Sequence, residues 1–362
     1  MDKFLVRERL EEKEKSLSPF AIQSRYSRGR KIPEPLSDLR TEFQRDRDRI
    51  LHTKAFRRLK HKTQVFLTPL GDHYVTRLTH TLEVTQIART IARALNLNED
   101  LTEAIGLGHD LGHTPFGHLG EEALNRLCSQ GFKHNHHSLR IVEILEKDGK
   151  GLNLTFEVKQ GIVSHSKPRG DFLANLNVNY EEQNLTLEAQ IIRISDAVAY
   201  VNHDLADAFR ARILETKDIP YEVTNVLGNR HSERINSLVS DIVSSSLISN
   251  SIDNDKRSKL PVISMTNRVR DSLYTLREFL FDQVYLPAGK GPEGKSARGM
   301  MELLFDYYKK HPSEIPEEYK NFGINPEQSI IDYIAGMTDQ YAIRIAEKIQ
   351  PGIAAPFLSR LI

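Results

Sequence analysis

The chain has 362 residues and an almost balanced charge, with 50 lysines and arginines against 49 acidic residues and a formal net charge of +1. That balance excludes a uniformly basic nucleic-acid coat and an acidic tail protein. A hydrophobic fraction of 39% excludes a disordered or membranous composition, and a chain of this length can bury a sizeable core. Length alone suggests about two domains.

The cysteine content and the N-terminus favour a cytoplasmic protein. Cys128 is the only cysteine, so it forms no intramolecular disulfide and no cysteine-based zinc site. The N-terminus lacks the apolar core of a signal peptide, and no run of about 18 consecutive apolar residues occurs. We therefore expect a cytoplasmic protein with no membrane partner.

Helical periodicity dominates the chain. Apolar residues recur at helical spacing over residues 37–60 and 78–95. Asn98 is a predicted N-cap for a helix through Leu107. Further helices are predicted over residues 120–130, 136–147, 185–210, 214–242 with a break, 267–284, 299–311 and 326–348.

Strand signals are weak and loop signals are local. Residues 175–184 alternate enough for a short hairpin. Residues 244–259 and 287–298 have the composition of loops, which either cover a site or only connect elements. The sequence thus predicts a mainly α fold with little β structure.

Histidines are concentrated in one part of the chain, with six of the fourteen between residues 109 and 137. The densest stretch runs from His109-Asp110 to His118. A neighbouring His and Asp offer a neutral nitrogen and an anionic oxygen to a divalent cation. His80 begins one apolar helix, and Asp196 has apolar neighbours on both sides within another. Taken singly, such a histidine is more often a buried residue with hydrogen-bond partners in the core, and such an aspartate more often forms a salt bridge or caps a helix.

Taken together, His80, His109-Asp110 and Asp196 resemble the metal-binding signature of the HD superfamily of phosphohydrolases. Two imidazole nitrogens and two carboxylate oxygens leave positions for water and substrate oxygens, unlike a closed structural zinc site. The resemblance implies a divalent metal cofactor, such as manganese, magnesium or another first-row ion, held by these four residues.

Longer blocks are similar to bacterial deoxyguanosinetriphosphate triphosphohydrolase-like proteins: residues 41–50, 55–66, 77–84, 109–118 and 332–339. The resemblance implies hydrolysis of a deoxynucleoside triphosphate at the α-phosphorus, which releases deoxynucleoside and inorganic triphosphate for control of the nucleotide pool. It also implies an HD-domain helical core with additional helices. We expect an N-terminal extension at residues 1–35, the HD-type core at 36–212 and a C-terminal helical region packed on it at 213–362.

The same resemblance assigns catalytic and phosphate-binding roles. His118 matches the catalytic histidine, and Glu121 follows at i+3, where it can orient the ring. Arg77 and His113 match residues that contact phosphate, and one of His134 and His136 is expected to do the same. The part that His118 plays in proton transfer is left open.

Three more residues match the sugar pocket of the family, namely Gln64, Tyr200 and Asp204. Tyr200 and Asp204 follow Asp196 at i+4 and i+8, so Asp196, Tyr200 and Asp204 share one helix face. One departure is Ala197, because animal members of the wider family have a lysine there. Arg193, Lys159 and Lys167 are candidates to supply the missing positive charge.

Between Arg40 and Lys62 the chain carries nine lysines and arginines against three acids. These residues can face the triphosphate, an allosteric nucleotide or single-stranded nucleic acid, or they can lie on a solvated face or in intersubunit salt bridges. The family resemblance also implies a homo-oligomer, for example a hexamer.

Two other functions compete with triphosphate hydrolysis. Another HD-type phosphohydrolase, a nucleotidase or a phosphodiesterase, would need the same four ligands but not Gln64, Tyr200 or Asp204. A nucleotide-sensing or nucleic-acid-binding module would need neither His118 nor Glu121. The presence of every one of these residues favours a deoxynucleoside triphosphate triphosphohydrolase.

Overall fold

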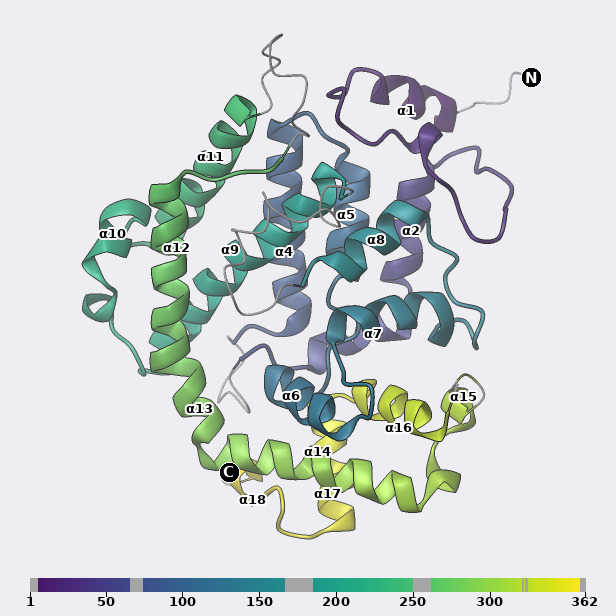
Figure 1. Ribbon diagram of the computed structural model, residues 1–362, viewed down its shortest axis with the longest axis vertical. Coiled ribbons are helices and arrows are strands. Elements are labelled where there is room, and N and C mark those ends of the chain that lie inside the picture. The colour runs from purple at the N-terminus through teal and green to yellow at the C-terminus, as the bar shows by residue number, and fades with distance from the viewer. Residues whose placement is uncertain are drawn as a thin grey trace. The chain divides into compact units, whose positions relative to one another are not determined.

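The computed structural model of the chain describes residues 6–65, 74–166, 185–249, 262–320, 322 and 325–358. In these ranges helices form almost all of the regular structure (Figure 1). Only two isolated antiparallel bridges accompany them, between Arg30 and Thr155 and between Thr63 and Thr76. The predicted mainly α fold is therefore confirmed, and residues 175–184, where a hairpin was considered, lie outside the described residues.

The helices of the first half of the chain are α1 (Val6–Glu14), α2 (Glu42–Leu51), α3 (Lys54–Arg58), α4 (Arg77–Ala94), α5 (Glu99–Gly108), α6 (Gly117–Leu127), α7 (His134–Arg140) and α8 (Phe156–Ser164). Those of the second half are α9 (Leu187–Arg210), α10 (Tyr221–Leu227), α11 (His231–Ser249), α12 (Asn267–Leu280), α13 (Leu286–Lys290), α14 (Pro292–Lys310), α15 (Glu317–Lys320), α16 (Pro326–Ala335), α17 (Asp339–Ile349) and α18 (Ala355–Leu358). Short π-helical turns extend α7 over Ile141–Leu145 and α12 over Phe281–Tyr285. No helix among the described residues combines the length and the apolar content needed to cross a membrane.

Capping residues explain several helix boundaries. The Asn98 side chain accepts a hydrogen bond from the Leu101 amide at 3.1 Å, which confirms the predicted N-cap of α5. The continuous helix predicted over residues 37–60 is wrong, because Thr53 accepts from the Phe56 amide and starts α3 as a separate helix. Thr338 likewise starts α17, so that the predicted helix 326–348 is two helices.

The loop predicted over residues 287–298 is also wrong. Pro287 lies in the first turn of α13 and Pro292 in the first turn of α14. A proline in the first turn removes an amide that has no partner inside the helix, so it begins a helix as readily as it breaks one. The other predicted loop begins within α11, which continues to Ser249, and residues 250–259 lie outside the described residues.

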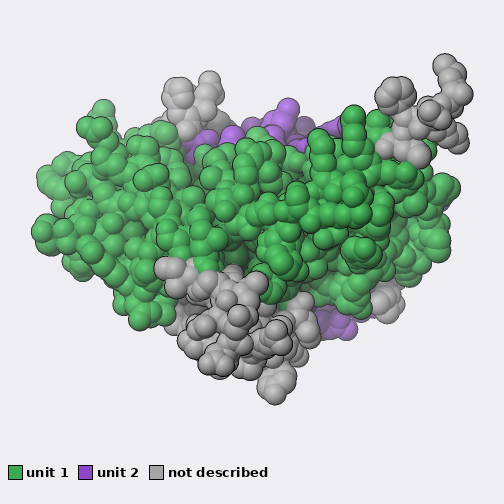
Figure 2. All heavy atoms as spheres, turned by 90° about the horizontal axis from the view of Figure 1, so that it is seen from above, with its two compact units in different colours: residues 1–50, 82–109, 153–279 green, residues 51–81, 110–152, 280–362 purple. Residues whose placement is uncertain are grey.

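The chain divides into two compact units, each built from three separate stretches (Figure 2). The first unit comprises residues 1–50, 82–109 and 153–279. Helices α5, α8 and α9 pack against one another in it, and α11 packs on α9. Fully buried apolar side chains of this packing include Leu101, Ile105, Val158, Ile191 and Leu205.

The second unit comprises residues 51–81, 110–152 and 280–362. Its longest helix, α14, packs against α6, α16, α17 and α18 (Figure 1). Phe116, Leu124, Met300, Leu304 and Ile334 belong to one continuous buried cluster. The C-terminal helices of this unit thus share a core with α6, the helix that carries His118.

Candidate active site and metal ligands

The pair His109-Asp110 follows the last residue of α5 directly, and both side chains are buried. Nδ1 of His109 lies 2.6 Å from the carbonyl oxygen of Gly106. Because a carbonyl only accepts, this nitrogen carries the hydrogen, and the lone pair that can bind a metal is on Nε2. The His165 ring packs edge-on against the His109 ring, with centroids 5.0 Å apart.

Asp110 lies beside two residues of the first turn of α4. Arg77 Nη1 donates to Asp110 Oδ2 at 2.7 Å, and His80 Nε2 lies 4.0 Å from the same oxygen. All three side chains are buried. The second unit therefore brings together two of the four expected metal ligands, and their imidazole nitrogen and carboxylate oxygen suit a divalent first-row metal.

Among the buried side chains of the second unit, those of Arg77, Gln64 and His113 keep polar atoms that have no hydrogen-bond partner among the described residues. The atoms are Nε and Nη2 of Arg77, Oε1 of Gln64 and Nδ1 of His113. Arg77 and His113 are each 1% exposed and Gln64 is 5% exposed. Buried polar groups without partners cost free energy that a ligand can recover. A guanidinium, an amide oxygen and an imidazole together suit a ligand with anionic oxygens and hydroxyls.

A cluster of histidines surrounds Glu121. Its Oε1 accepts from the His134 amide at 2.8 Å and lies 2.8 Å from His134 Nδ1, and its Oε2 lies 3.4 Å from His118 Nδ1. The His134 ring stacks on the His113 ring with centroids 4.3 Å apart. One ligand atom each from Asp110, His113 and His134 falls within 4.8 Å of the others, as do those of His113, His118 and Glu121. The predicted His118–Glu121 pairing therefore belongs to a wider network.

The histidines of this cluster differ in the direction of their pKa shifts. Burial and the Arg77 guanidinium hold the pKa of His113 well below its ordinary value, so this ring is neutral. Burial opposes charge on His134 too, but the Glu121 carboxylate outweighs it and raises the pKa of His134. Burial alone would raise the pKa of Glu121, yet His134 and His118 hold that pKa far below its usual range. The arrangement favours a Glu121–His134 ion pair beside a neutral His113.

Glycines allow the segments that carry these residues to approach closely. A Cβ on Gly112 would lie 2.2 Å from the Ser138 amide nitrogen and 2.4 Å from the His134 carbonyl oxygen, so a side chain there would push α7 away. Gly117, with φ +57°, follows Phe116, whose φ of 61° is also left-handed. This turn starts α6 and sets the direction of its first residues.

Helix α9 in the first unit carries the remaining predicted residues. Asp196 and Tyr200 are partly buried, and Asp204 is 1% exposed. The Asp204 Oδ1 atom lies 2.8 Å from Nδ1 of His203, and the rings of Tyr200 and His203 meet edge-on at 6.2 Å. Burial opposes charge on His203, but Asp204 raises its pKa.

The sequence reasoning missed some residues that the structure places beside predicted ones. His203 lies off the Asp196–Tyr200–Asp204 face and His165 lies in another helical region, so neither followed from motif spacing. Of the two alternatives His134 and His136, the structure places His134 in the histidine cluster, whereas His136 is exposed. His109 and Asp196 belong to the first unit and His80 and Asp110 to the second, so the complete four-ligand set remains a prediction.

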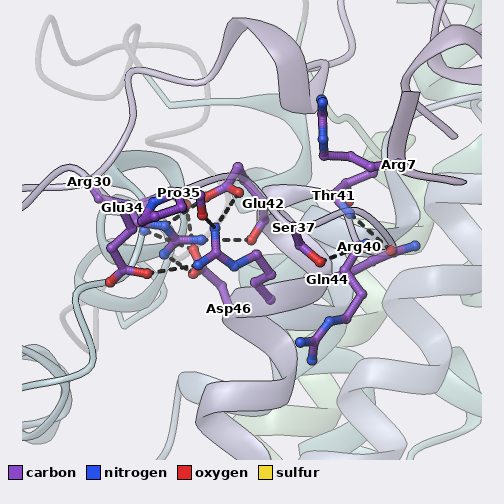
Figure 3. Close-up of polar contacts among 12 residues, drawn as sticks. Arg7, Arg30, Glu34, Pro35, Ser37, Arg40, Thr41, Glu42, Gln44 and Asp46 are labelled. Atoms are coloured by element: carbon purple, nitrogen blue, oxygen red, sulfur yellow. Dashed lines mark hydrogen bonds and ion pairs between the residues drawn. The ribbon is translucent and has the colours of Figure 1, made fainter. Parts of the chain in front are cut away.

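Four arginines of the basic segment pair with acids of the same unit, namely Arg40, Arg45, Arg47 and Arg49. Arg30 pairs with Glu42 and Asp46 (Figure 3). Glu34 accepts from Arg45 at 2.8 Å. The other pairs are Arg40–Asp48, Arg45–Glu42, Arg47–Glu103 and Arg49–Glu34. These arginines therefore form salt bridges within one chain, an alternative that the sequence did not suggest, and intersubunit pairing stays a prediction.

The cations proposed to replace the lysine absent at Ala197 have different positions. Arg193 is buried in α9 and Lys159 is partly buried in α8, both in the first unit. Lys167 lies outside the described residues. Their role therefore stays a prediction.

Comparison with known proteins agrees with these features. The HD domain family matches residues 77–201, and the phosphohydrolase-associated domain family matches residues 263–348. A protein of Caldanaerobacter subterraneus subsp. tengcongensis named deoxyguanosinetriphosphate triphosphohydrolase-like protein is 51% identical over 344 residues, which cover 93% of this chain and 94% of that protein. The chain belongs to the deoxyguanosinetriphosphate triphosphohydrolase-like family.

Other members of the deoxyguanosinetriphosphate triphosphohydrolase-like family align over similar lengths. Relatives with the same name in Desulfatibacillum aliphaticivorans and Clostridium tetani are 46% and 45% identical over 95% and 96% of this chain, and 97% of each relative is covered. Among solved structures, a hypothetical protein from Aquifex aeolicus has a TM-score of 0.45 and 19% identity over 87% of this chain and 71% of that one.

Proposed function

We propose that this chain is a metal-dependent hydrolase that converts deoxynucleoside triphosphates into deoxynucleosides and inorganic triphosphate. The observation that carries the proposal is the set of buried atoms on Gln64, Arg77 and His113 that have no partner among the described residues. An anionic, hydroxyl-bearing substrate supplies the partners that these atoms lack. The names of the relatives support the same class of substrate.

Within this proposal, the metal ligands are His80, His109, Asp110 and Asp196. When bound, a divalent ion supplies positive charge that polarises the α-phosphoryl group and offsets the charge of the triphosphate. The tautomer of His109 and the buried, Arg77-bonded carboxylate of Asp110 suit such an ion. The proposed ion is magnesium, manganese or another first-row transition metal, since carboxylate oxygens suit magnesium and manganese and imidazole nitrogens suit the transition metals.

The residues of the second unit are assigned to phosphate binding and to proton delivery. Arg77 donates from Nε and Nη2 to phosphate oxygens, and neutral His113 forms a hydrogen bond to the same group. Glu121 Oε2 faces Nδ1 of His118 and can orient the ring. We assign to Nε2 of His118 the delivery of a proton to the leaving 5′-oxygen. We assign a phosphate contact to His134 in preference to His136, because His134 stacks on His113.

The sugar is assigned to Gln64, Tyr200 and Asp204. An amide oxygen and a carboxylate accept hydrogen bonds from a 3′-hydroxyl, and a tyrosine ring leaves no room for a ribose 2′-hydroxyl. A ribonucleotide would therefore bind less well than the matching deoxynucleotide. These contacts separate a deoxynucleotide hydrolase from other HD-type phosphohydrolases.

The remaining partner proposals rest on the family resemblance. We propose a cytoplasmic homo-oligomer that a second, allosteric nucleotide activates, with single-stranded nucleic acid as a further binding partner. Arg57 and Lys60 are exposed residues of the basic segment and are available for such anionic partners. Size-exclusion chromatography with light scattering, with and without nucleotide, tests the assembly.

The test of function is incubation of the purified protein with each deoxynucleoside triphosphate, singly and mixed, in manganese or magnesium, followed by anion-exchange separation. Deoxynucleoside and inorganic triphosphate in equal amounts are expected, and removal of the metal with a chelator stops their formation. Orthophosphate or pyrophosphate as the product contradicts the proposal and favours a nucleotidase or another phosphohydrolase. Activity that appears only in mixtures supports the allosteric nucleotide.

A further inference from the structure

The motif at residues 332–339 has no role in the site described above, although it lies in the second unit with His113 and His118. Its last residue, Asp339, begins α17 and is 8% exposed. Oδ1 of Asp339 accepts from the Phe116 amide at 3.0 Å. Oδ2 accepts from the Thr63 amide at 2.8 Å and from the Thr63 hydroxyl. One carboxylate therefore joins two segments far apart in sequence.

A second connection involves Lys62, the residue before Thr63. Its side chain is buried, and Nζ donates to the carbonyl oxygen of His113 and, at 2.8 Å, to that of Ala335. Ala335 is the last residue of α16. We call Lys62, Thr63 and Asp339 the loop clamp, because together they tie residues 113–116 to the turn between α16 and α17.

The segments held by the loop clamp carry four of the proposed site residues. Gln64 follows Thr63 directly, Arg77 donates its amide to the Lys62 carbonyl at 3.1 Å, and His113 and His118 flank Phe116. Phe116 is a non-glycine residue with φ 61° and ψ 23°, a conformation that needs support from its surroundings. The hydrogen bond from its amide to Asp339 is part of that support.

The turn at Gly117 also packs closely against Gln64 and Arg77. A Cβ on Gly117 would lie 3.0 Å from the Gln64 carbonyl oxygen and 3.1 Å from Arg77 Nη2. A shift of the 113–117 loop would therefore move His118 relative to both Gln64 and Arg77. Misplacing a reacting group by about 1 Å can lower a rate by about two orders of magnitude.

We propose that Asp339 and Lys62 are positioning residues, which set the geometry of His113, His118 and Gln64 without touching the substrate. This inference rests on the proposed function, since it concerns the same site. It gives the phosphohydrolase-associated region at residues 263–348 an indirect part in catalysis, through the position of the site residues, beyond its contribution to the shared core. It also explains why a C-terminal motif accompanies the HD motif in this sequence.

The chemistry of the clamp requires a carboxylate at residue 339. Asp339 accepts three hydrogen bonds on two oxygens, whereas an asparagine has one oxygen and one amino group. In Asp339→Asn, the amino group would face either the Phe116 amide or the Thr63 amide, which are both donors. The variant keeps the size of the side chain and loses at least one of the two connections.

The experiment compares Asp339→Asn with Asp46→Asn, a matched control in the first unit. Asp46 is fully buried and likewise accepts from the amide and the hydroxyl of a threonine, Thr155, at 2.8 and 2.7 Å. We expect kcat of Asp339→Asn, per folded molecule, to fall about 10- to 100-fold. A smaller rise in KM is expected with it, because the binding residues His113 and Gln64 shift as well. Asp46→Asn should lower the unfolding temperature and keep kcat. A kcat of Asp339→Asn within twofold of the wild type overturns the proposal.

Hydrogen exchange measured by mass spectrometry gives a readout that does not depend on activity. We expect faster exchange across residues 113–118 in Asp339→Asn and no change there in Asp46→Asn. If the wild-type protein cleaves no deoxynucleoside triphosphate, the proposed function fails, and this exchange still decides whether the loop clamp exists. Unchanged exchange in Asp339→Asn overturns the clamp.

Thr63→Val is a milder variant for the case in which Asp339→Asn does not fold. It removes only the hydroxyl and keeps the backbone amide that donates to Asp339. We expect a smaller decrease in kcat in the same direction and faster exchange across residues 113–118. Wild-type values of both quantities in a folded Thr63→Val protein contradict the proposal.

Discussion

Glu188 makes the stability of the first unit dependent on pH. The side chain is fully buried in the first turn of α9, where Oε1 accepts from the Ile22 amide at 3.1 Å and the Asn98 amide at 3.2 Å. Burial outweighs these hydrogen bonds and raises the pKa of Glu188 to about 7. The native state therefore favours the neutral carboxyl, and ionisation of this group above neutral pH opposes folding.

The magnitude follows from linkage between protonation and folding. A folded-state pKa of about 7 against the ordinary 4.5 corresponds, at about 1.4 kcal/mol per pH unit, to about 3 kcal/mol. Because the folded-state pKa of Glu188 is higher than its unfolded-state pKa, the contribution of Glu188 to the free energy of unfolding is fully present below about pH 4.5. It is lost as the pH rises through about 7. In Glu188→Gln the neutral amide keeps an oxygen for both backbone donors and cannot ionise.

We therefore expect Glu188→Gln to be more stable than the wild type at pH 8 to 9, by up to about 3 kcal/mol, and the difference to shrink toward pH 5. Urea unfolding at several pH values, followed by circular dichroism, measures it. Glu12→Gln, at an exposed residue of α1, is the control and should keep the pH profile of the wild type. A difference that does not change with pH, or a wild type that is the more stable protein at pH 8, refutes the reasoning.

Three further variants test the site and the basic segment. Arg77→Met removes the donors proposed for phosphate and should raise KM about tenfold or more in steady-state assays, since charged hydrogen bonds contribute about 1.5–3 kcal/mol each; an unchanged KM excludes the contact. His118→Ala should lower kcat about 10²- to 10⁴-fold while metal content, measured by elemental analysis, stays the same; full activity with metal bound removes the catalytic role. Glu34→Gln should lower the free energy of unfolding by about 1 kcal/mol at pH 7, a small value because the site is partly exposed. The hydrogen bond from Arg49 is the main cause that lowers the pKa of Glu34 to about 2. That difference should vanish in acid titrations as the pH falls from about 4.5 through 2, and a pH-independent difference contradicts it.

Local signals in the sequence predicted those parts of the fold that depend on neighbouring residues. Asn98 caps α5 because an asparagine before two acidic residues suits the first turn of a helix wherever that helix packs. The i+3 spacing of His118 and Glu121 likewise gave their pairing. Thr53 and Thr338 show the limit, since the same apolar periodicity continues across both caps and hides the break between helices.

Other features depend on contacts between distant segments, which periodicity does not contain. Asp339 meets Thr63 and Phe116 across 276 and 223 residues of sequence, so its role emerged only from the structure. His134 was distinguished from His136 by its stacking on His113. The pairing of Asp204 with His203 is local, but His203 lies off the face of α9 that carries Asp196, Tyr200 and Asp204, so their i+4 spacing did not predict it.

Hydrolysis of a deoxynucleoside triphosphate in ¹⁸O-labelled water tests the central claim most directly. Attack of water on the α-phosphorus places the label in the released triphosphate and leaves the 5′-hydroxyl of the deoxynucleoside unlabelled, as mass spectrometry of both products can show. We predict one labelled oxygen per triphosphate, and about 10²- to 10⁴-fold slower formation of this product by His118→Ala. Label in the deoxynucleoside, or release of orthophosphate or pyrophosphate in place of triphosphate, would contradict the account.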